Sequence, residues 1–213
     1  MTRHIERQRE REALRPRIID AARALYGEGG CDAVTLRAVA GRIGYSTTII
    51  YKLFADKNEL LRAVTDEDFA GLTQALGAGD RADASLPERV LGLGRSLVAF
   101  ARQQPGHYYR IFINPPPPIA VEESAAERGN PDQDAYAFAR QLFAALADSS
   151  PAITVRDPDL LLQMFWSAMH GAISLRLVLA DEPWVEWQPL ETLVEQSLLA
   201  LLYGIGAMEK ESK

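Results

Sequence analysis

The chain has 213 residues, enough for one medium domain or two small ones, and its 47% hydrophobic content supports a buried core. Its single cysteine, Cys31, excludes an intramolecular disulfide, and the charged first residues lack the apolar stretch of a secretion signal. No uncharged run reaches the ~20 apolar residues that a membrane span needs, so we expect a cytoplasmic protein without a membrane partner.

The net charge of −6 is unevenly distributed along the chain. Residues 1–60 contain 11 Lys and Arg against 8 Asp and Glu, a net charge of +3, whereas the remainder carries −9. A basic N-terminal part can face DNA phosphates while an acidic remainder keeps the protein dissolved. Such asymmetry is common, so by itself it does not decide between a DNA-binding protein and other classes.

Helical periodicity recurs throughout and strand patterns are nearly absent, which predicts an all-α protein with about nine helices. We expect a charged arm over residues 1–12 and a first helix over residues 13–26, ended by glycines. Two short helices follow in residues 35–54. A connecting helix is expected over residues 57–77, and an Asp-x-x-Glu cap marks its first turn.

The rest of the chain predicts further long helices whose starts carry a capping residue or a proline. These helices are expected from Ser85 to Gln104, Asn130 to Asp148, Asp157 to Ala180 and Pro189 to Gly204. Between the first two lies a stretch rich in proline and then in acidic residues. We expect residues 114–130 to form a flexible loop, either a plain connector or a lid over a pocket.

The most informative stretch runs from Thr35 to Phe54, TLRAVAGRIGYSTTIIYKLF. Thr35 and Ser46 are expected to cap its two short helices, and Gly44 between them permits a tight turn with positive φ. Two short helices joined by a glycine turn and backed by a longer helix form a helix-turn-helix, which fits the major groove of DNA. We therefore divide the chain into a three-helix DNA-binding domain with its arm (residues 1–56) and a helical domain (residues 57–213).

This stretch resembles the DNA-binding domain of the tetracycline-repressor (TetR) family over about residues 13–65. The shared pattern is a Thr that opens the second helix, a small core residue, Gly-x-Ser, Tyr-x-x-Phe and a Lys that opens the fourth helix: Thr35, Ala40, Gly44-Tyr45-Ser46, Tyr51-Lys52-Leu53-Phe54 and Lys57. Further along, the segment from Trp166 to Gly171, WSAMHG, resembles the Trp-His-Gly branch of that family. The resemblance implies a homodimer that binds a palindromic operator in double-stranded DNA.

The resemblance also implies which side chains contact DNA. Thr35, Tyr51 and Lys57 match positions that usually touch phosphates, and their hydroxyl, phenol and ammonium groups all bond phosphate oxygens. The candidate base readers lie on or beside the second short helix: Tyr45, Ser46, Thr47, Thr48 and Lys52. At positions 47 and 48 many relatives carry Lys or Arg and then Gly, so no operator sequence can be carried over. The N-terminal arginines could add phosphate or minor-groove contacts, or they could form part of a solvated helix extension: Arg3, Arg7, Arg9, Arg11 and Arg15.

The helix over residues 157–180 is apolar almost all round, yet Gln163, Ser167 and His170 share one face of it with Ser174. These groups need partners in a pocket or across a dimer, and for His170 alone a structural role is expected over a ligand contact. The resemblance implies a mostly apolar pocket for a small effector, with a few polar contacts. Its candidate lining residues are Phe100, Tyr108, Tyr109, Phe112, Phe138, Gln163, Trp166 and His170.

The helices over residues 157–180 and 189–204 are rich in leucine and small residues, which predicts a two-fold dimer built from four helices. A monomeric core is the alternative. The candidate interface residues are Ala168, Gly171, Ala172, Leu175, Leu198, Leu201 and Leu202.

These patterns together predict a sequence-specific DNA-binding regulator of transcription, a repressor that a small effector releases from its operator. The alternative is a DNA-binding regulator without a small effector, which acts constitutively or through a protein partner. We expect no enzyme, metal site or cofactor, because the sequence shows no paired metal ligands, no phosphate-binding glycine loop and no nucleophile with placed partners.

Overall fold

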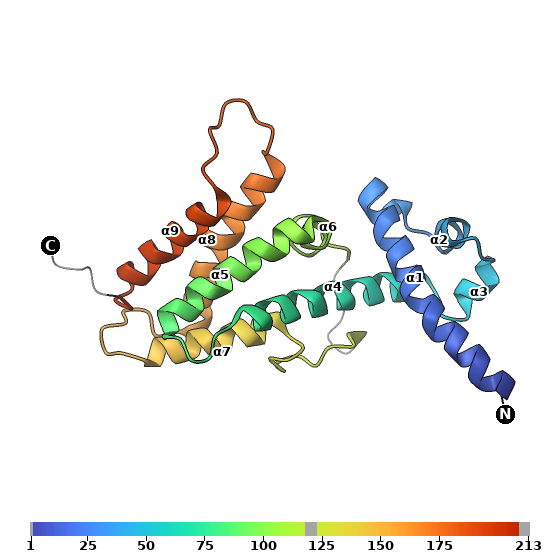
Figure 1. Cartoon of the computed structure of the whole chain (residues 1–213), viewed down its shortest axis with the longest axis horizontal. Helices are drawn as coiled ribbons and strands as arrows, with labels where there is room; N and C mark the ends of the chain where they lie inside the picture. Colours follow the sequence, from blue (N-terminus) through green and yellow to red (C-terminus); the bar gives the residue numbers. More distant parts are fainter. Residues whose placement is uncertain (1, 118–122, 209–213) are drawn as a thin grey trace. The chain divides into compact units, whose positions relative to one another are not determined.

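The computed structural model describes the backbone of residues 2–117 and 123–208 and the side chains of residues 13–117 and 123–208. Over these residues the chain is helical and contains no strand, which confirms the all-α prediction. The α-helices, labelled in Figure 1, are α1 (Thr2–Ala33), α2 (Leu36–Ile43), α3 (Thr47–Tyr51), α4 (Lys57–Gly79), α5 (Leu86–Gln103), α6 (Pro105–Tyr108), α7 (Ala135–Asp148), α8 (Pro158–Val178) and α9 (Leu190–Gly204). A π-helix, η1 (Tyr109–Ile113), directly follows α6.

The chain forms two compact units. The N-terminal unit comprises Met1–Asp68 and Tyr109–Ala125, and the helical body comprises Phe69–Tyr108 and Ala126–Lys213. The division falls inside α4 after Asp68, and not at residue 56 as expected from the sequence. The reason is that the first half of α4 buries Leu60, Leu61 and Val64 in the core of the N-terminal unit.

The core of the N-terminal unit is assembled from short apolar faces of α1, α2, α3 and α4. Its most buried members are Ile18, Ile19, Ala22, Val34, Val39, Ile50, Phe54 and Leu60. Helix α1 begins at Thr2, so the backbone expected to be an arm is helical, and its assigned range continues to Ala33. Gly29 and Gly30 lie inside that range with non-helical φ/ψ values of −153°/22° and 67°/−162°. The glycines were expected to end the helix after residue 26, whereas in the structure Gly29 and Gly30 kink it inside a range that continues to Ala33.

The turn between α2 and α3 forms as predicted. The Oγ1 atom of Thr35 accepts a hydrogen bond from the Ala38 N–H at 3.0 Å and caps α2. Gly44 ends α2 with φ 72° and ψ 31°, a left-handed conformation that costs glycine little because it has no Cβ. Ser46 precedes α3, but its side chain makes no capping hydrogen bond, so the predicted side-chain cap at that position is wrong.

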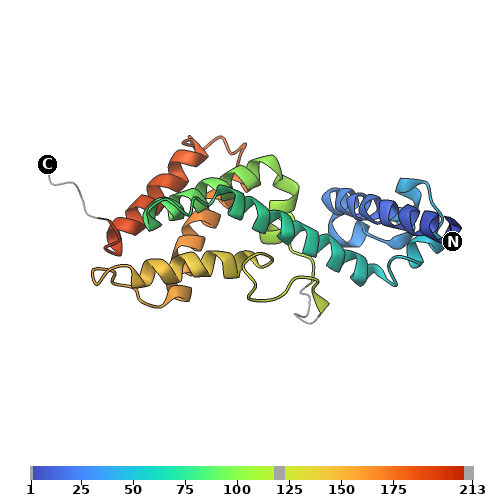
Figure 2. The ribbon, with the colours of Figure 1, turned by 60° about the horizontal axis from the view of Figure 1, so that its bottom comes forward.

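The helical body packs α5, α7, α8 and α9 against one another (Figures 1 and 2). Helices α5 and α9 approach closely at Gly94, where a Cβ would lie 2.4 Å from Cδ1 of Leu198 and 3.3 Å from Cγ1 of Val194. Glycine at this position therefore allows a spacing that a larger residue would prevent. The apolar side chains between these helices include Leu97, Phe143, Phe165 and Leu198, all buried.

The predicted helix starts in the body are confirmed with one exception. Ser85 and Glu88 form a reciprocal capping box at α5, and the carboxylate of Asp157 caps α8. The helix expected from Asn130 begins instead at Ala135. Its cap is Asp134, whose carboxylate accepts from the backbone N–H groups of Tyr136 and Ala137, while Asn130 belongs to the preceding turn. The Asn130-Pro131 pair therefore lies in the turn before the helix, and the carboxylate of Asp134 provides the cap.

Gly44 and Gly41 offer a matched test of the turn, because a Cβ at either position would meet no atom within 4 Å. Only Gly44 has positive φ. We expect Gly44→Ala to lower the free energy of unfolding by about 1–2 kcal/mol, since a side chain in the left-handed region is strained. Gly41→Ala, inside α2, should raise that free energy by about 0.5–1 kcal/mol. Urea unfolding measures both, and equal effects would contradict the assigned conformation.

Candidate nucleic-acid interface

The N-terminal unit presents an exposed polar face along α3. Tyr51 and Lys52 lie three and four residues after Thr48, and all three are exposed, Tyr51 to 59%. The opposite side of the same short helix buries Ile50 completely in the core. Thr47 is half-buried, whereas Tyr45 and Ser46 in the turn are exposed. Of the five candidate base readers, four are therefore accessible and one is partly covered.

The three candidate phosphate contacts differ in their surroundings. Tyr51 is exposed, and Thr35 is exposed at the N-terminus of α2 with its hydroxyl oxygen already engaged as the cap. Lys57 is half-buried, and its Nζ donates to the carbonyl oxygen of Cys31 at 2.7 Å, near the end of α1. An ammonium group has three N–H donors, so this bond leaves Lys57 able to donate to a phosphate as well.

Arg17 joins this face although the sequence analysis missed it. Its Nη1 donates to the phenol oxygen of Tyr45 at 3.3 Å, and its guanidinium carbon lies 5.4 Å from the centre of the Tyr45 ring. Both residues are exposed, and the contact places a cation from α1 beside the turn that precedes α3. The two positions are 28 residues apart, so local periodicity alone could not pair them.

Arg15 was considered from the sequence as a DNA contact, but in the structure its side chain contacts residues of its own unit. Its guanidinium carbon lies 5.2 Å from the centre of the Phe54 ring, and its Nη1 lies 3.8 Å from Oε1 of Glu67. The arm arginines at positions 3, 7, 9 and 11 lie outside the residues whose side chains are described. A contribution of those four residues to DNA contacts stays a prediction.

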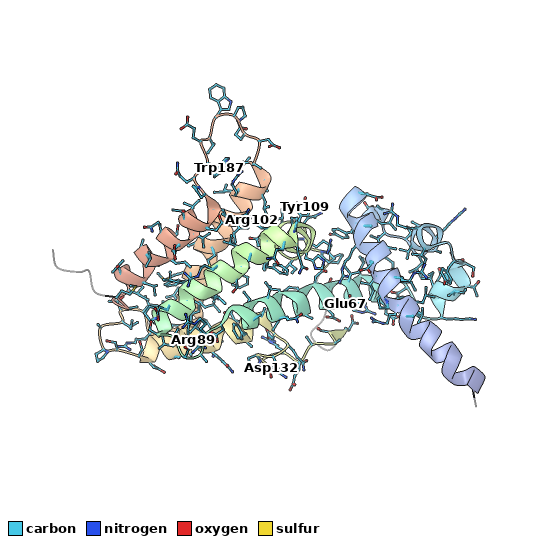
Figure 3. All side chains as sticks on the ribbon, viewed as in Figure 1. Glu67, Arg89, Arg102, Tyr109, Asp132 and Trp187 are labelled. Carbon is cyan, nitrogen blue, oxygen red and sulfur yellow. The ribbon has the colours of Figure 1, made fainter. Side chains whose placement is uncertain are left out.

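A buried ionic cluster lies within the N-terminal unit, centred on Asp68, which is 1% exposed. Arg110 donates to its carboxylate from Nε at 2.7 Å and from Nη2 at 3.2 Å, and Arg23 donates from Nε at 3.0 Å. Arg23 also bonds Glu67, labelled on α4 in Figure 3, at 2.9 Å. Burial lowers the pKa of Arg23, but Asp68 and Glu67 outweigh it and raise that pKa above its usual value. The cluster joins α1, α4 and η1 within one unit.

Further contacts attach the described ends of the 114–130 segment to the same unit. The Tyr26 hydroxyl donates to the backbone oxygen of Asn114 at 2.9 Å. On the other side of residues 118–122, which are not described, Arg62 bonds Glu123 at 3.1 Å and Asp66 accepts from the Ser124 hydroxyl at 2.8 Å. These ends contact α1 and α4, and the choice between connector and lid stays open.

The candidate effector residues are divided between the two units. Tyr109 and Phe112 belong to the N-terminal unit, and Tyr109 is 45% exposed (labelled in Figure 3). The other six belong to the helical body: Phe100, Tyr108, Phe138, Gln163, Trp166 and His170. We therefore restrict the candidate effector cluster to the body.

Within the body, aromatic and polar groups meet around His170. The buried hydroxyl of Tyr108 lies 2.7 Å from Nδ1 of His170, and the two rings stack with centroids 5.6 Å apart. Trp166 contacts His170 at a centroid distance of 5.5 Å and Tyr136 at 5.7 Å. Burial lowers the pKa of His170 to about 3 and raises the pKa of Tyr108 to about 12. Both groups are therefore neutral near pH 7.

The polar stripe expected on one face of α8 finds its partners within the chain. His170 bonds Tyr108, Gln163 donates to the Tyr136 hydroxyl at 3.4 Å, and Ser167 donates to the backbone oxygen of Gln163 at 2.7 Å. This arrangement agrees with the structural role expected for His170. It leaves the effector contacts of these residues as a prediction.

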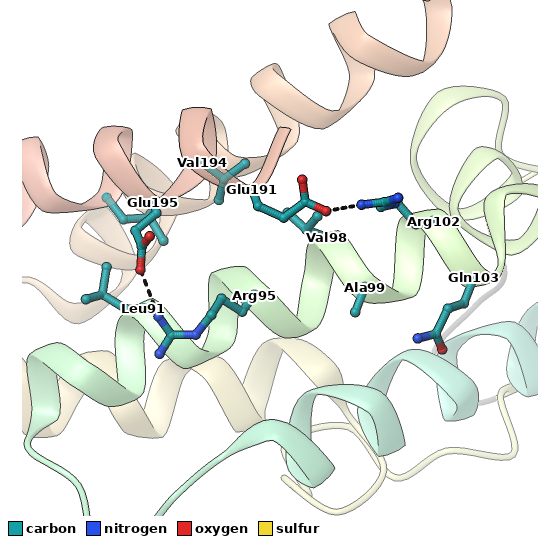
Figure 4. Close-up of a pocket in the computed structure, with 10 residues that line it drawn as sticks. Leu91, Arg95, Val98, Ala99, Arg102, Gln103, Glu191, Val194 and Glu195 are labelled. Carbon is teal, nitrogen blue, oxygen red and sulfur yellow. Dashed lines mark hydrogen bonds and ion pairs between the residues drawn. The ribbon is translucent and has the colours of Figure 1, made fainter. Parts of the chain in front are cut away.

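A groove of about 570 Å³ opens between α5 and α9 (Figure 4). Its apolar floor includes Val98, Val194 and Leu198, and two ion pairs cross it, Arg95 with Glu195 at 2.9 Å and Arg102 with Glu191. None of the candidate effector residues lines this groove.

The candidate dimer face consists of α8 side chains that the body leaves uncovered. Leu175 is 52% exposed, Gly171 is exposed, and Ala168 is half-buried, as is Leu201 on α9. Three other candidates are corrected, because Ala172, Leu198 and Leu202 are already buried within their own subunit. Leu160 and Val178, 53% and 61% exposed, extend the same face and were not predicted. The helical spacing of Leu160, Leu175 and Val178 along α8 is the sequence pattern that could have predicted this extension.

The loop between α8 and α9 carries a further exposed apolar group. Trp184 is 92% exposed, whereas Trp187, labelled in Figure 3, donates from Nε1 to the backbone oxygen of Leu179 at 2.9 Å. Trp187 thus fastens the base of the loop to the end of α8.

Two negative observations apply to the described part of the chain. It contains no group of three or more His, Cys, Asp or Glu side chains placed to hold a metal ion. None of its helices is long and apolar enough to cross a membrane.

Two models of known protein families match this chain. Residues 18–64 match the model of bacterial regulatory proteins of the tetR family, and residues 90–180 match a tetracyclin repressor-like C-terminal domain. The chain belongs to the TetR family. The first match contains α2, the turn at Gly44 and α3, and the predicted family is confirmed. The resemblance to the Trp-His-Gly branch stays a prediction.

Curated relatives match mainly the N-terminal unit. The HTH-type transcriptional repressor KstR of Mycobacterium tuberculosis is 40% identical over 65 residues, which cover 30% of this chain and 28% of KstR. The match therefore spans less than a third of that relative. An uncharacterized HTH-type transcriptional regulator of the same organism is 26% identical over 166 residues, 76% of this chain and 70% of that protein.

Solved structures share the fold over most of the chain. The protein SCO4313 superimposes with a TM-score of 0.73 at 24% identity and covers 92% of this chain and 98% of that structure. The fatty acid degradation regulator FadR from Bacillus halodurans has a TM-score of 0.68 at 15% identity and covers 88% and 94%. At these identities the likeness establishes the fold.

The low pKa of His170 gives a pH test of the body. Burial lowers this pKa to about 3 from 6.5 in the unfolded chain, so protonation below pH 6.5 stabilises the unfolded state. The penalty is absent above pH 6.5 and grows as the pH falls towards 3. Between pH 7 and pH 5 the wild type should lose about 2 kcal/mol of unfolding free energy that His170→Gln does not lose. Urea unfolding at several pH values measures this difference, and parallel curves would contradict the assigned burial.

Proposed function

We propose that this TetR-family protein is a dimeric repressor that binds a palindromic operator and is released from it by a small, mostly apolar effector. The observation that carries the DNA-binding part is the two-sided character of α3. Ile50 anchors one side in the core, and the other side exposes Thr48, Tyr51 and Lys52. A helix held in this way can place three polar side chains against base edges and phosphates in the major groove.

Electrostatics supports the same proposal. The exposed cations Arg17, Arg37 and Lys52 lie on α1, α2 and at the end of α3. They can bond phosphates, which contribute most of the affinity for any duplex and make it dependent on salt. The N-terminus of α2 adds backbone N–H donors beside Thr35.

Repression is supported by the name of the KstR relatives, which are transcriptional repressors. The effector part is supported by the cluster of Tyr108, Tyr136, Trp166 and His170 in the body, which offers aromatic surface and polar groups together. The alternative, a regulator without a small effector, is supported by the mutual hydrogen bonding of these polar groups. A thermal-shift screen with apolar compounds separates the two, because a ligand that binds only the folded state raises its melting temperature.

The DNA-binding proposal predicts different effects for two cations. A duplex is first selected from random DNA by the wild type. Lys52→Gln should weaken binding by about 1–3 kcal/mol and relax the sequence preference, because a base contact is lost. Arg17→Gln should weaken binding to all duplexes and reduce the dependence of log K on log salt by about 1, because a phosphate contact is lost. Fluorescence anisotropy at several salt concentrations measures both.

The matched control for these variants is Arg102→Gln, which removes an exposed arginine of the body that pairs with Glu191. Its affinity and salt dependence should equal those of the wild type. If all three variants lose affinity equally, the contacts are not located on the α3 face. If the wild type selects no preferred sequence, the sequence-specific function itself is wrong.

The dimer part of the proposal is tested on α8. Leu175 is 52% exposed, and Leu175→Glu would place a charge in the proposed interface without opening the subunit core. We expect this variant to be monomeric at concentrations where the wild type is dimeric, because an unpaired buried charge is costly. Ala99→Glu, at an exposed position on α5, is the control and should remain dimeric. Analytical ultracentrifugation measures the mass, and an unchanged dimer with Leu175→Glu would move the interface elsewhere.

A further inference from the structure

We propose that Arg110 and Asp68 are positioning residues that transmit changes at the Tyr108–His170 contact to helices α1 and α4. The proposal rests on the proposed function, because its biological consequence is a change in operator affinity. Neither side chain can touch DNA directly, since Arg110 is 6% exposed and Asp68 is 1% exposed. Any effect of these residues on DNA binding must therefore pass through the helices that they hold.

The first step of the argument is the placement of the buried carboxylate. Asp68 lies on α4, at the last residue of its first half, and receives Arg23 from α1 and Arg110 from η1. Arg110 binds with both Nε and Nη2, which fixes the plane of its guanidinium against the carboxylate. A displacement of the η1 backbone therefore acts on α4 through a bidentate bond and on α1 through the shared carboxylate.

The second step is the position of Arg110 in the chain. Tyr108 and Arg110 are separated by one residue, yet Tyr108 belongs to the helical body and Arg110 to the N-terminal unit. Tyr108 is completely buried and bonds His170 of α8, while Tyr109 between them is 45% exposed. The five-residue π-helix is closed by the bond from the Asn114 N–H to the Tyr109 oxygen. Tyr108, directly before it, and Arg110, its second residue, are both buried, each in its own unit. A change at Tyr108 therefore occurs two residues away from Arg110, which binds Asp68.

The third step is the choice of residue types. A buried ion pair contributes little to stability compared with apolar side chains of the same volume, because its charges lose their hydration. What it does provide is a defined geometry, since only one relative placement satisfies both partners. The ion pair of Arg110 with Asp68 therefore fits a role in positioning the helices better than a role in stability alone.

The test is a double-mutant cycle between the two ends. Tyr108→Phe removes the hydroxyl that bonds His170 but keeps the ring, and Arg110→Met removes the grip on Asp68 but keeps most of the side-chain volume. Amide hydrogen exchange of residues 18–26 and 60–68 is followed by mass spectrometry in the full-length protein without DNA. Tyr108→Phe should change exchange there by about 2- to 30-fold in the wild-type background and leave it unchanged in the Arg110→Met background.

The same four proteins are then measured for affinity to the selected duplex. The effect of Tyr108→Phe on the dissociation constant should likewise disappear in the Arg110→Met background. Additive effects of the two substitutions, in exchange or in affinity, would overturn the proposal, because a purely structural role of each residue gives additivity. If the wild type binds no duplex with preference, the proposed function fails, while the exchange cycle still decides this inference.

Two further variants guard against a general loss of folding. Arg89→Met removes a comparable bidentate arginine, which grips Asp80 at 2.7 and 2.8 Å inside the body (Arg89 is labelled in Figure 3). It should not change the response of residues 18–26 and 60–68 to Tyr108→Phe. Arg110→Lys keeps the charge but loses the two-point bond, and it should restore only part of the response. Full restoration by lysine would show that charge alone acts, and would overturn the positioning role.

Discussion

The proposed DNA-binding surface of this protein depends on the burial of one side of a helix only five residues long. A helix of that length is unstable in water by itself, because nucleation is not repaid by enough hydrogen bonds. Ile50 and Phe54, together with the left-handed turn at Gly44, fix α3 and the residues around it to α1, α2 and α4. The proposed DNA contacts Thr48, Tyr51 and Lys52 are exposed on the other side, and their arrangement depends on that core. The same core extends into the first half of α4, so the exposed face of α3 and the start of the connecting helix are held by one shared set of buried side chains.

Charge plays a different part from apolar burial in this unit. The apolar side chains stabilise the N-terminal unit without direction, whereas the cluster of Arg23, Asp68 and Arg110 specifies how α1, α4 and η1 are arranged. Removing one partner of a buried pair costs about 3–5 kcal/mol, since the remaining charge stays in a medium that solvates it poorly. The helical body also contains a bidentate pair, Arg89 with Asp80, whereas the ion pairs across the α5–α9 groove are exposed and contribute little. The cluster around Asp68 differs from these pairs because Arg110 belongs to the segment where the chain passes from the body into the N-terminal unit.

The sequence predicted what depends on local spacing and missed what depends on distant contacts. Thr35, Gly44, Ser85 and Asp157 mark their helix ends correctly, because capping and left-handed turns involve residues within four positions of one another. Periodicity could not decide which apolar leucines face the body and which face outward, so Leu198 and Leu202 were placed in the interface although they are buried within the subunit. Arg17 beside Tyr45 and Arg110 beside Asp68 join positions 28 and 42 residues apart, and single-sequence patterns carry no information about such pairs.

The most direct measurement of the central claim is a hydroxyl-radical footprint of the wild-type protein on its selected duplex. Two copies of α3, presented by a symmetric dimer, should protect two backbone patches centred about 34–36 Å apart, one turn of DNA or a multiple of it. The patches should be related by the two-fold axis of a palindromic sequence. A single protected patch, or uniform weak protection along the whole duplex, would contradict the presentation of two recognition helices by this fold.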